Sequence, residues 1–264
     1  MKTFHILIAE HVVRVRTASD MVRDWMLSNF YVKDETDIEG RLPDLTIRTD
    51  TGYGTPFESF DVSITEDEDM ITFRRNDYVV KIDKWFHTAY VAVYDTFALK
   101  HAMMNLYSSF IVHHGWGLLV HSSCVVEGGK AYLFSGYSGA GKSTVAKLSM
   151  PRPLLSDEAT IVKLNESGKA LAYDSPFRSE LEMRADQKAY SLKGIYFLRQ
   201  SQHVAAAPLS KGEGFLQLAD KVFYWSYNPQ ETTKIFRLCR QLSERVPMFD
   251  LYFQKNDSFW EMIS

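Results

Sequence analysis

Short apolar runs separated by polar turns dominate the first third of the chain. Residues 4–15 are apolar and rich in β-branched side chains, which favours a strand. Ser19 and Asp20 then offer an N-cap for a helix over 21–27. Further strand-like runs lie at 45–49, 60–64, 70–74, 78–82 and 90–94. The turn residues between these runs predict an antiparallel meander.

The remainder of the chain alternates helical and strand-like patterns. Apolar residues at three- and four-residue spacing predict a helix over 97–114, which Gly115 ends. Residues 118–127 predict a strand broken at its polar centre, and Gly128-Gly129 predicts a hairpin to a return strand at 131–135. Later strands are predicted at 152–158, 159–164, 170–173, 194–199, 204–209 and 248–253, and helices at 211–219 and 230–244.

Composition and charge narrow the class of protein. The chain has 264 residues, of which 45% are hydrophobic and 24% charged, as is usual for globular proteins. A net charge of −3 gives no support for bulk attraction to nucleic acid or to an anionic membrane. The N-terminus predicts a strand rather than a signal peptide, and no apolar run is long enough for a membrane span. We therefore expect a cytoplasmic protein whose Cys124 and Cys239 are reduced and buried.

The residues most indicative of chemistry lie between the strand at 131–135 and a predicted helix. Residues 136–144, Gly-Tyr-Ser-Gly-Ala-Gly-Lys-Ser-Thr, match the phosphate-binding P-loop pattern G-x-x-x-x-G-K-[ST]. At average composition a chain of this length matches the pattern by chance roughly once in a hundred. Backbone N–H groups would cradle nucleotide phosphates, Lys142 would reach the β- and γ-phosphates, and Ser143 would bind Mg²⁺. The expected nucleotide-binding residues are Gly136, Ser138, Gly139, Ala140, Gly141, Lys142, Ser143 and Thr144.

Two further features accompany the loop. Asp157 and Glu158 end a short predicted strand only fourteen residues after Ser143, whereas the acids of parallel-sheet NTPases usually lie further along the chain. His121 lies in the strand that the hairpin joins to the P-loop strand. A carboxylate that holds Mg²⁺ and a group that accepts a proton are what phosphoryl transfer requires. The acidic run 66–69 lacks spaced ligand positions, so a solvated turn is favoured there over a metal site.

Together these residues resemble the catalytic domain of HPr kinase/phosphorylase. That family has a histidine fifteen residues before the first P-loop glycine, as His121 stands before Gly136, and a G-x-S-G-x-G-K-S loop. It also has an acidic pair after the next strand, where Asp157-Glu158 lies. The resemblance covers residues 121–164 well and extends weakly to 246–251. It implies a mixed α/β (α+β) fold, with a phosphoenolpyruvate carboxykinase-like P-loop core and a largely antiparallel sheet, and a strand-rich N-terminal part.

The chain departs from the bifunctional family in three places. Thr144 replaces a glutamate, Glu158 replaces an aspartate, and the later arginine- and glycine-bearing phosphorylase motif has no match. The chain therefore looks more like stand-alone relatives that phosphorylate a serine of a precursor peptide, as in lasso peptide biosynthesis. This resemblance implies two domains: a strand-rich N-terminal domain at 1–95 and an HPr kinase-like catalytic domain at 96–264.

The resemblance also assigns roles. Asp157 would hold Mg²⁺ or act as the base, Glu158 would share one of these tasks, and His121 would orient the acids or contact the γ-phosphate. Arg178, and less so Arg184, are candidates for neutralising the transferred phosphate, with a surface role as the alternative. Tyr137 would pack on strands or on the acceptor. The aromatic run 223–227 favours core packing over a nucleobase or peptide platform.

The expected function is therefore an ATP- and Mg²⁺-dependent kinase, a transferase that phosphorylates a hydroxyl group of a peptide or small protein. Its expected partners are a nucleotide triphosphate and that acceptor, without nucleic acid or membrane, and the resemblance implies a homo-oligomer. Two alternatives stay open: a small-molecule kinase with the same site, and a non-catalytic nucleotide-binding sensor. The acidic pair argues against the sensor, because binding a nucleotide without transfer does not require a second carboxylate near the γ-phosphate.

Overall fold

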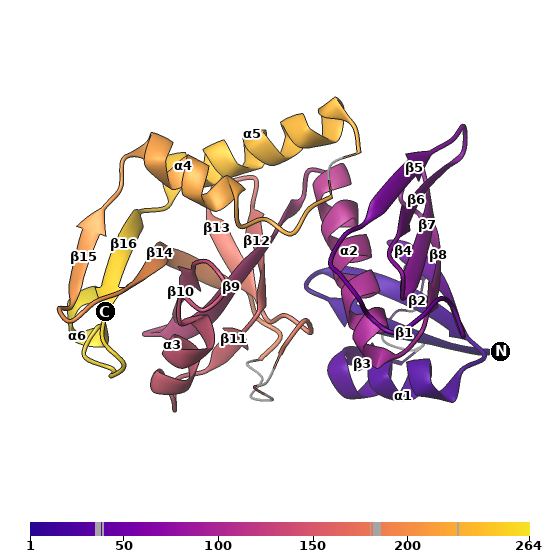
Figure 1. The fold of residues 1–264 in the computed structure, drawn as a ribbon, viewed down its shortest axis with the longest axis horizontal. Helices are drawn as coiled ribbons and strands as arrows, with labels where there is room; N and C mark the ends of the chain where they lie inside the picture. The colour runs from indigo at the N-terminus through magenta and orange to yellow at the C-terminus, as the bar shows by residue number, and fades with distance from the viewer. Residues whose placement is uncertain (35–37, 39, 180, 182–185, 226) are drawn as a thin grey trace. The chain divides into compact units, whose positions relative to one another are not determined.

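The chain forms two compact units, each built on its own sheet (Figure 1). The computed structural model describes residues 1–34, 38, 40–179, 181, 186–225 and 227–264. The N-terminal unit comprises Met1–His113 and Trp225–Asn228, and the C-terminal unit comprises His114–Tyr224 and Pro229–Ser264. The protein is thus of mixed α/β composition, and each unit is described separately.

The N-terminal unit is an eight-stranded sheet in the order β3-β1-β2-β4-β8-β7-β6-β5. Its strands are β1 (Lys2–Ile8), β2 (His11–Thr17), β3 (Tyr31–Lys33), β4 (Leu45–Thr51), β5 (Ser63–Glu66), β6 (Met70–Arg74), β7 (Tyr78–Asp83) and β8 (Thr88–Val93). Helix α1 (Asp20–Asn29) begins at the predicted N-cap, where the Ser19 side chain accepts a hydrogen bond from the N–H of Val22. Helix α2 (Thr96–His113) follows β8 and packs on β7 and β8.

Two strand predictions for this unit need correction. The run 4–15 is not one strand but the β1–β2 hairpin, which turns at Ala9 with a φ of 52°. The antiparallel meander is confirmed only for β5 to β8, because β4 pairs in parallel with both β2 and β8. The chain between β2 and β4 includes α1 and is long enough for the crossover that a parallel pair requires.

Helix α2 belongs to the N-terminal unit, not to the C-terminal part as predicted. The boundary between 95 and 96 would assign the helix to the catalytic part, whereas the structure groups it with the N-terminal unit. Residues 102–112 of the helix are all buried, and strands β7 and β8 cover part of that surface. The apolar spacing predicted the helix, but it carries no information about which sheet buries it.

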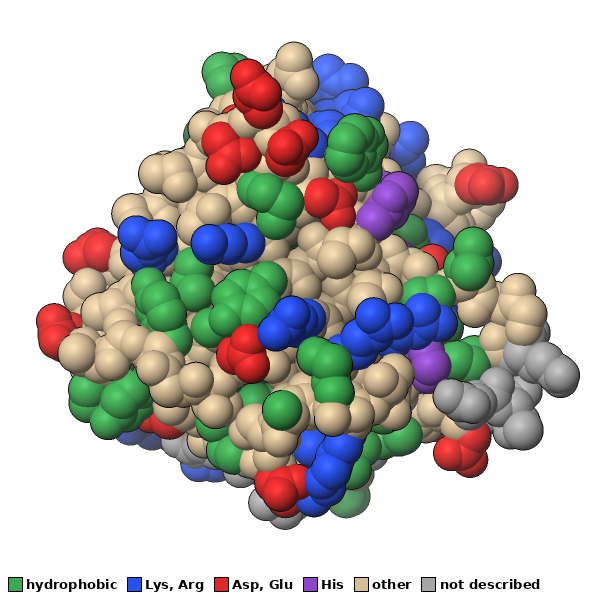
Figure 2. Space-filling model, turned by 90° about the vertical axis from the view of Figure 1, so that its right-hand side faces the viewer, with side chains coloured by type: hydrophobic (Ala, Val, Ile, Leu, Met, Phe, Trp, Pro, Cys, Tyr) green, Lys and Arg blue, Asp and Glu red, His purple; other side chains and the backbone are tan. Residues whose placement is uncertain are grey.

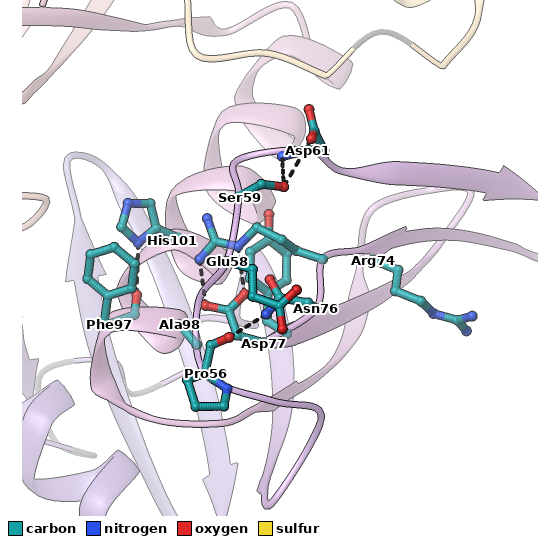
Figure 3. Close-up of polar contacts among 12 residues, drawn as sticks. Pro56, Glu58, Ser59, Asp61, Arg74, Asn76, Asp77, Phe97, Ala98 and His101 are labelled. Carbon is teal, nitrogen blue, oxygen red and sulfur yellow. Dashed lines mark hydrogen bonds and ion pairs between the residues drawn. The ribbon is translucent and has the colours of Figure 1, made fainter.

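A buried ion pair holds the loop between β4 and β5 (Figure 3). The Arg75 guanidinium donates to both carboxylate oxygens of Asp77, at 2.6 and 2.8 Å, and both side chains are almost fully buried. The guanidinium also lies over the rings of Tyr78 and Phe57, at 4.6 and 4.8 Å from their centroids. Next to it, the Asn76 side chain donates to the carbonyl of Pro56, which attaches the loop to the β6–β7 turn.

The surface drawn in Figure 2 has a mixed character. Lys and Arg side chains are interspersed there with Asp, Glu and hydrophobic groups rather than gathered into one basic area. The acidic run 66–69 forms the end of β5 and its turn into β6, where Asp67 accepts hydrogen bonds from the N–H groups of Asp69 and Met70. The prediction of a hairpin turn at this place is confirmed.

The C-terminal unit has a second eight-stranded sheet, in which β9 is central. Its strands are β9 (Gly117–Glu127), β10 (Lys130–Ser135), β11 (Leu154–Ser156), β12 (Ala159–Leu164), β13 (Ala170–Tyr173), β14 (Tyr190–Gln200), β15 (Ala205–Pro208) and β16 (Met248–Phe253). Its helices are α3 (Lys142–Leu148), α4 (Lys211–Ala219), α5 (Pro229–Arg245) and α6 (Trp260–Ile263). Strands β10, β11 and β12 all run antiparallel to β9. Strands β10, β14 and β16 run parallel to one another, so the sheet is mixed.

The predicted hairpin into the P-loop is confirmed. Gly128 and Gly129 both have positive φ, at 56° and 73°, as a two-residue hairpin turn requires. Strand β9 is continuous rather than broken at its centre, since the hydroxyl of Ser122 is satisfied inside the sheet by Thr160 and by the carbonyl of Val120. Cys124 and Cys239 are free and buried as predicted, and burial raises the pKa of both thiols. Within the described ranges, no helix is long and apolar enough to cross a membrane.

Candidate functional site

Two strand ends bring the predicted site residues to one edge of the C-terminal sheet. Strand β10 ends at Ser135 and leads into the P-loop, and β11 ends at Ser156 immediately before Asp157 and Glu158. Both strands run antiparallel to β9, so their carboxyl ends point the same way, and ligands usually bind at such ends. His121 lies on β9, where it pairs with Ala159.

The P-loop glycines meet two different requirements. Gly139 has a φ of 77°, a backbone angle that residues other than glycine rarely adopt. Gly141 has a φ of 110°, and a Cβ placed there would come within 2.6 Å of the Phe253 ring. The loop therefore depends on glycine both for its backbone shape and for its close packing on β16.

Lys142 has its ammonium group at the centre of the loop. Its Nζ donates to the carbonyls of Gly136 and Tyr137, at 3.1 and 3.0 Å. Burial and the charge of Lys221 lower the pKa of Lys142, and the carboxylate of Glu158 acts in the opposite direction. Because both hydrogen-bond acceptors are neutral carbonyls, the lysine retains a positive charge that can attract phosphate.

A pocket of about 340 Å³ joins the loop to the other predicted residues. It is lined by His121, Ser138, Gly139, Gly141, Lys142, Ser143, Thr144, Asp157, Glu158 and Ser179. The structure thus brings the loop, the histidine and the acidic pair together around one space. Ser179 was not predicted, and Gly136 and Ala140 are not among the described lining residues.

Asp157 is held by the segment that follows β13. Its carboxylate accepts hydrogen bonds from the N–H and hydroxyl of Ser179, at 3.0 and 2.9 Å, and from the N–H of Leu181 at 2.9 Å. Three donors favour the ionised carboxylate and fix its orientation. Glu158 is attached to β9 through its backbone, since its carbonyl accepts from the N–H of Ser122 at 3.0 Å.

The electrostatic surroundings of His121 keep its imidazole neutral. Burial, followed by the charges of Lys142 and Lys221, lowers the pKa of His121 to about 4. Its ring contacts that of Phe223 at a centroid distance of 5.2 Å. At neutral pH the histidine can therefore donate or accept a hydrogen bond, but it does not contribute a positive charge.

Lys221, like Ser179, is a residue that the sequence patterns did not indicate. It is buried, its Nζ lies 3.5 Å from the centroid of the Tyr137 ring, and it forms an ion pair with Asp220 at 2.5 Å. Its carbonyl accepts a hydrogen bond from the N–H of His121 at 2.7 Å. Lys221 follows α4 and belongs to no motif, so only the fold reveals that it adds a second cation beside the P-loop.

Arg178 is not positioned as predicted. Its guanidinium pairs with Asp174 at 2.5 Å and donates to the carbonyls of Leu154 and Leu155, and it is not among the described residues that line the pocket. It therefore braces β11, whereas its neighbour Ser179 reaches the pocket. Arg184 lies outside the described residues.

The aromatic run 223–227 and Tyr137 make packing contacts. Phe223 lies against His121, and Tyr227 contacts Phe73 within the N-terminal unit. Ser226 lies outside the described residues. Tyr137 is 64% exposed, with Lys221 on its face.

The donor set of the pocket suits Mg²⁺. Mg²⁺ is usually bound by one or two carboxylates and by substrate phosphates, and the pocket offers the Ser143 hydroxyl with the carboxylates of Asp157 and Glu158. A cluster of three or more His, Cys, Asp or Glu side chains able to hold a metal is absent from the described part of the chain. A metal at this site would therefore depend on phosphate oxygens as additional ligands.

Comparison with known proteins gives one family. A search of the curated proteins finds no match. A family model described as "SynChlorMet cassette protein ScmC" matches residues 92–264, which include α2, the P-loop, His121, the acidic pair and Lys221. The match covers more than half of the chain, and the protein therefore belongs to the SynChlorMet cassette protein ScmC family.

Proposed function

We propose that the protein is an ATP- and Mg²⁺-dependent kinase that transfers a γ-phosphoryl group to a hydroxyl group, a serine of a peptide or small protein. The observation that carries this proposal is that the P-loop, two carboxylates and His121 line one pocket. We also propose that the C-terminal unit has the phosphoenolpyruvate carboxykinase-like core of the HPr kinase family. Supporting this, a hairpin leads into the P-loop strand, and a short strand ends in the acidic pair.

The phosphate end of the site combines backbone and cationic groups. Loop N–H groups would bind the phosphates, and Lys142 would neutralise the β- and γ-phosphate oxygens. Lys221, whose charge acts on both Lys142 and His121, adds to the positive potential at the same place. Mg²⁺, held by Ser143 and a carboxylate, would supply further charge neutralisation when bound.

The two carboxylates of the acidic pair would have different roles in the transfer. Asp157 accepts three hydrogen bonds that favour its ionised form, which suits an oriented, permanently charged carboxylate. We therefore assign proton acceptance to Glu158. The acceptor hydroxyl loses its proton to Glu158 as its oxygen bonds to the γ-phosphorus, and the bond from that phosphorus to the β–γ bridging oxygen breaks to release ADP.

Transfer of label from γ-labelled ATP to serine-containing peptides tests the proposal. Lys142→Ala and Asp157→Asn should each abolish transfer, whereas Lys130→Ala should not, because Lys130 is exposed at the opposite end of β10. Wild-type transfer by both site variants would refute the site. Mass spectrometry of products from peptides and from free serine distinguishes a peptide kinase from a small-molecule kinase, and nucleotide binding without turnover would indicate a sensor.

A further inference from the structure

A second pocket adjoins the P-loop on the side of β14 and β16. It has a volume of about 190 Å³ and is lined by Gly141, Thr144, Gln200, Ser201, Phe253, Gln254 and Lys255. Gly141 and Thr144 also line the first pocket, so the two spaces meet at the loop. Strands β14 and β16 are parallel and end in register, with Gln200 beside Phe253. The pocket thus lies at the carboxyl ends of parallel strands, next to the loop that follows β10.

The lining combines an apolar wall with side chains that can recognise polar edges. Phe253 is buried under Gly141 and supplies the apolar wall. The carboxamides of Gln200 and Gln254 each offer an acceptor and an N–H group beyond the one that already donates within the protein, to Gly139 and Gln202 respectively, and Ser201 adds a hydroxyl. Gln200 also donates to the carbonyl of Gly139 at 2.8 Å, which ties this wall to the P-loop.

The order of groups along the loop indicates which end of a bound nucleotide would face the second pocket. In a P-loop, the lysine marks the β- and γ-phosphates, and here the two carboxylates lie in the lysine's pocket. The nucleoside must leave the phosphate chain at its α end, away from the carboxylates. The second pocket contains Thr144 and Gly141 but neither carboxylate, and so it lies in that direction.

We propose that this second pocket holds the nucleoside portion of the bound nucleotide, and that Gln200 and Gln254 hydrogen-bond the polar edge of the base or ribose. This inference rests on the proposed nucleotide function. It predicts that the chain binds nucleoside triphosphates more tightly than a bare triphosphate, because inorganic tripolyphosphate occupies only the first pocket.

Calorimetric titration of the full chain with Mg·ATP and with Mg·tripolyphosphate tests this assignment. In the double variant Gln200→Leu/Gln254→Leu, affinity for ATP should fall by about tenfold or more, while affinity for tripolyphosphate stays the same. Retained tripolyphosphate binding also reports that the variant is folded. The matched control is Gln202→Leu, which replaces an exposed side chain that is not among the described lining residues and keeps the backbone carbonyl that accepts from Gln254, and it should bind both ligands as wild type does.

The outcomes separate this inference from the proposed function. Three results would overturn the nucleoside pocket but leave the phosphate site intact. In the double variant, these are an equal fall in affinity for both ligands or no fall in either affinity. In the wild type, it is equal affinity for the two ligands. If the wild-type chain binds neither ligand, the proposed kinase function itself fails.

Discussion

At the scale of single residues, the site combines two cations, Lys142 and Lys221, with the carboxylates of Asp157 and Glu158. Lys142 and Lys221 are seventy-nine positions apart in sequence, yet each affects the ionisation of His121. Burying two like charges near one another is unfavourable unless an anion joins them. The two lysines therefore give separate predictions for ligand binding.

Replacing Lys221 tests the contribution of the second cation. Lys221→Met removes the charge and keeps most of the side-chain length, so affinity for Mg·ATP should fall about tenfold, less than for Lys142→Ala. Titration calorimetry at two salt concentrations checks this, and the variant should show a weaker salt dependence. An unchanged affinity would mean that Lys221 only packs on Tyr137.

The ionisation of His121 gives a prediction about pH. Its folded-state pKa of about 4 lies below the ordinary 6.5, so the unfolded chain binds more protons between these values. This group's contribution to stability should be present above pH 6.5 and should be lost as the pH falls toward 4. In denaturation experiments from pH 6.5 to pH 4, the free energy of unfolding should fall less in His121→Gln than in the wild type.

The same histidine can be followed directly by NMR titration. Lys221→Met should raise the pKa of His121, because the charge of Lys221 is one cause of the shift. A wild-type His121 that titrates near 6.5 would contradict the described surroundings.

At the scale of elements, the acidic pair depends on a segment distant in sequence. Ser179 and Leu181 supply three hydrogen bonds to the carboxylate of Asp157, and Arg178 braces β11 just before it. Ser179 and Leu181 therefore position the carboxylate of Asp157 within the pocket.

Ser179→Ala tests this positioning. It removes the hydroxyl donor but keeps the backbone N–H, so the catalytic rate should fall several-fold while KM for ATP changes little. Steady-state kinetics separates the two parameters, and Ser179→Thr, which keeps the hydroxyl, should restore most of the rate. A change in KM alone would assign Ser179 to nucleotide binding instead.

The elements also show how far the sequence could predict the structure. The P-loop, the Gly128-Gly129 hairpin and the short strand before Asp157 carry strong local signals, and the fold confirms where they lie. The parallel pairing of β4, the placement of α2 and the proximity of Lys221 depend on long-range packing, which local spacing does not encode. Arg178 pairs with Asp174 and is not among the described residues that line the pocket, a placement that local sequence does not reveal because an arginine near a site can equally brace a strand.

At the scale of the whole molecule, each unit has its own buried polar anchor. In the N-terminal unit this is the Arg75–Asp77 pair, whose side chains are about 2% and 1% exposed. In the C-terminal unit, Ser122, Ser156 and Thr160 link β9, β11 and β12 through their hydroxyl groups. These hydrogen bonds and the ion pair fix the strands relative to one another within each unit.

Removing one partner of the ion pair should destabilise the N-terminal unit. Asp77→Ala leaves a buried guanidinium unpaired, so the free energy of unfolding should fall by about 3–5 kcal/mol. Arg74→Ala is the matched control, since Arg74 is exposed and points away from the cluster (Figure 3). Chemical denaturation measures both, and a loss under 1 kcal/mol for Asp77→Ala would contradict the anchoring role.

In the proposed function, the pocket transfers phosphate and does not only bind a nucleotide. The most direct measurement compares Mg·ATP binding with single-turnover transfer to a serine-containing peptide in wild type and in Glu158→Gln. If Glu158 accepts the proton, the variant should keep its affinity for Mg·ATP within a few-fold, and its rate of transfer should fall by about a hundredfold or more. Wild-type transfer rates in Glu158→Gln would contradict it.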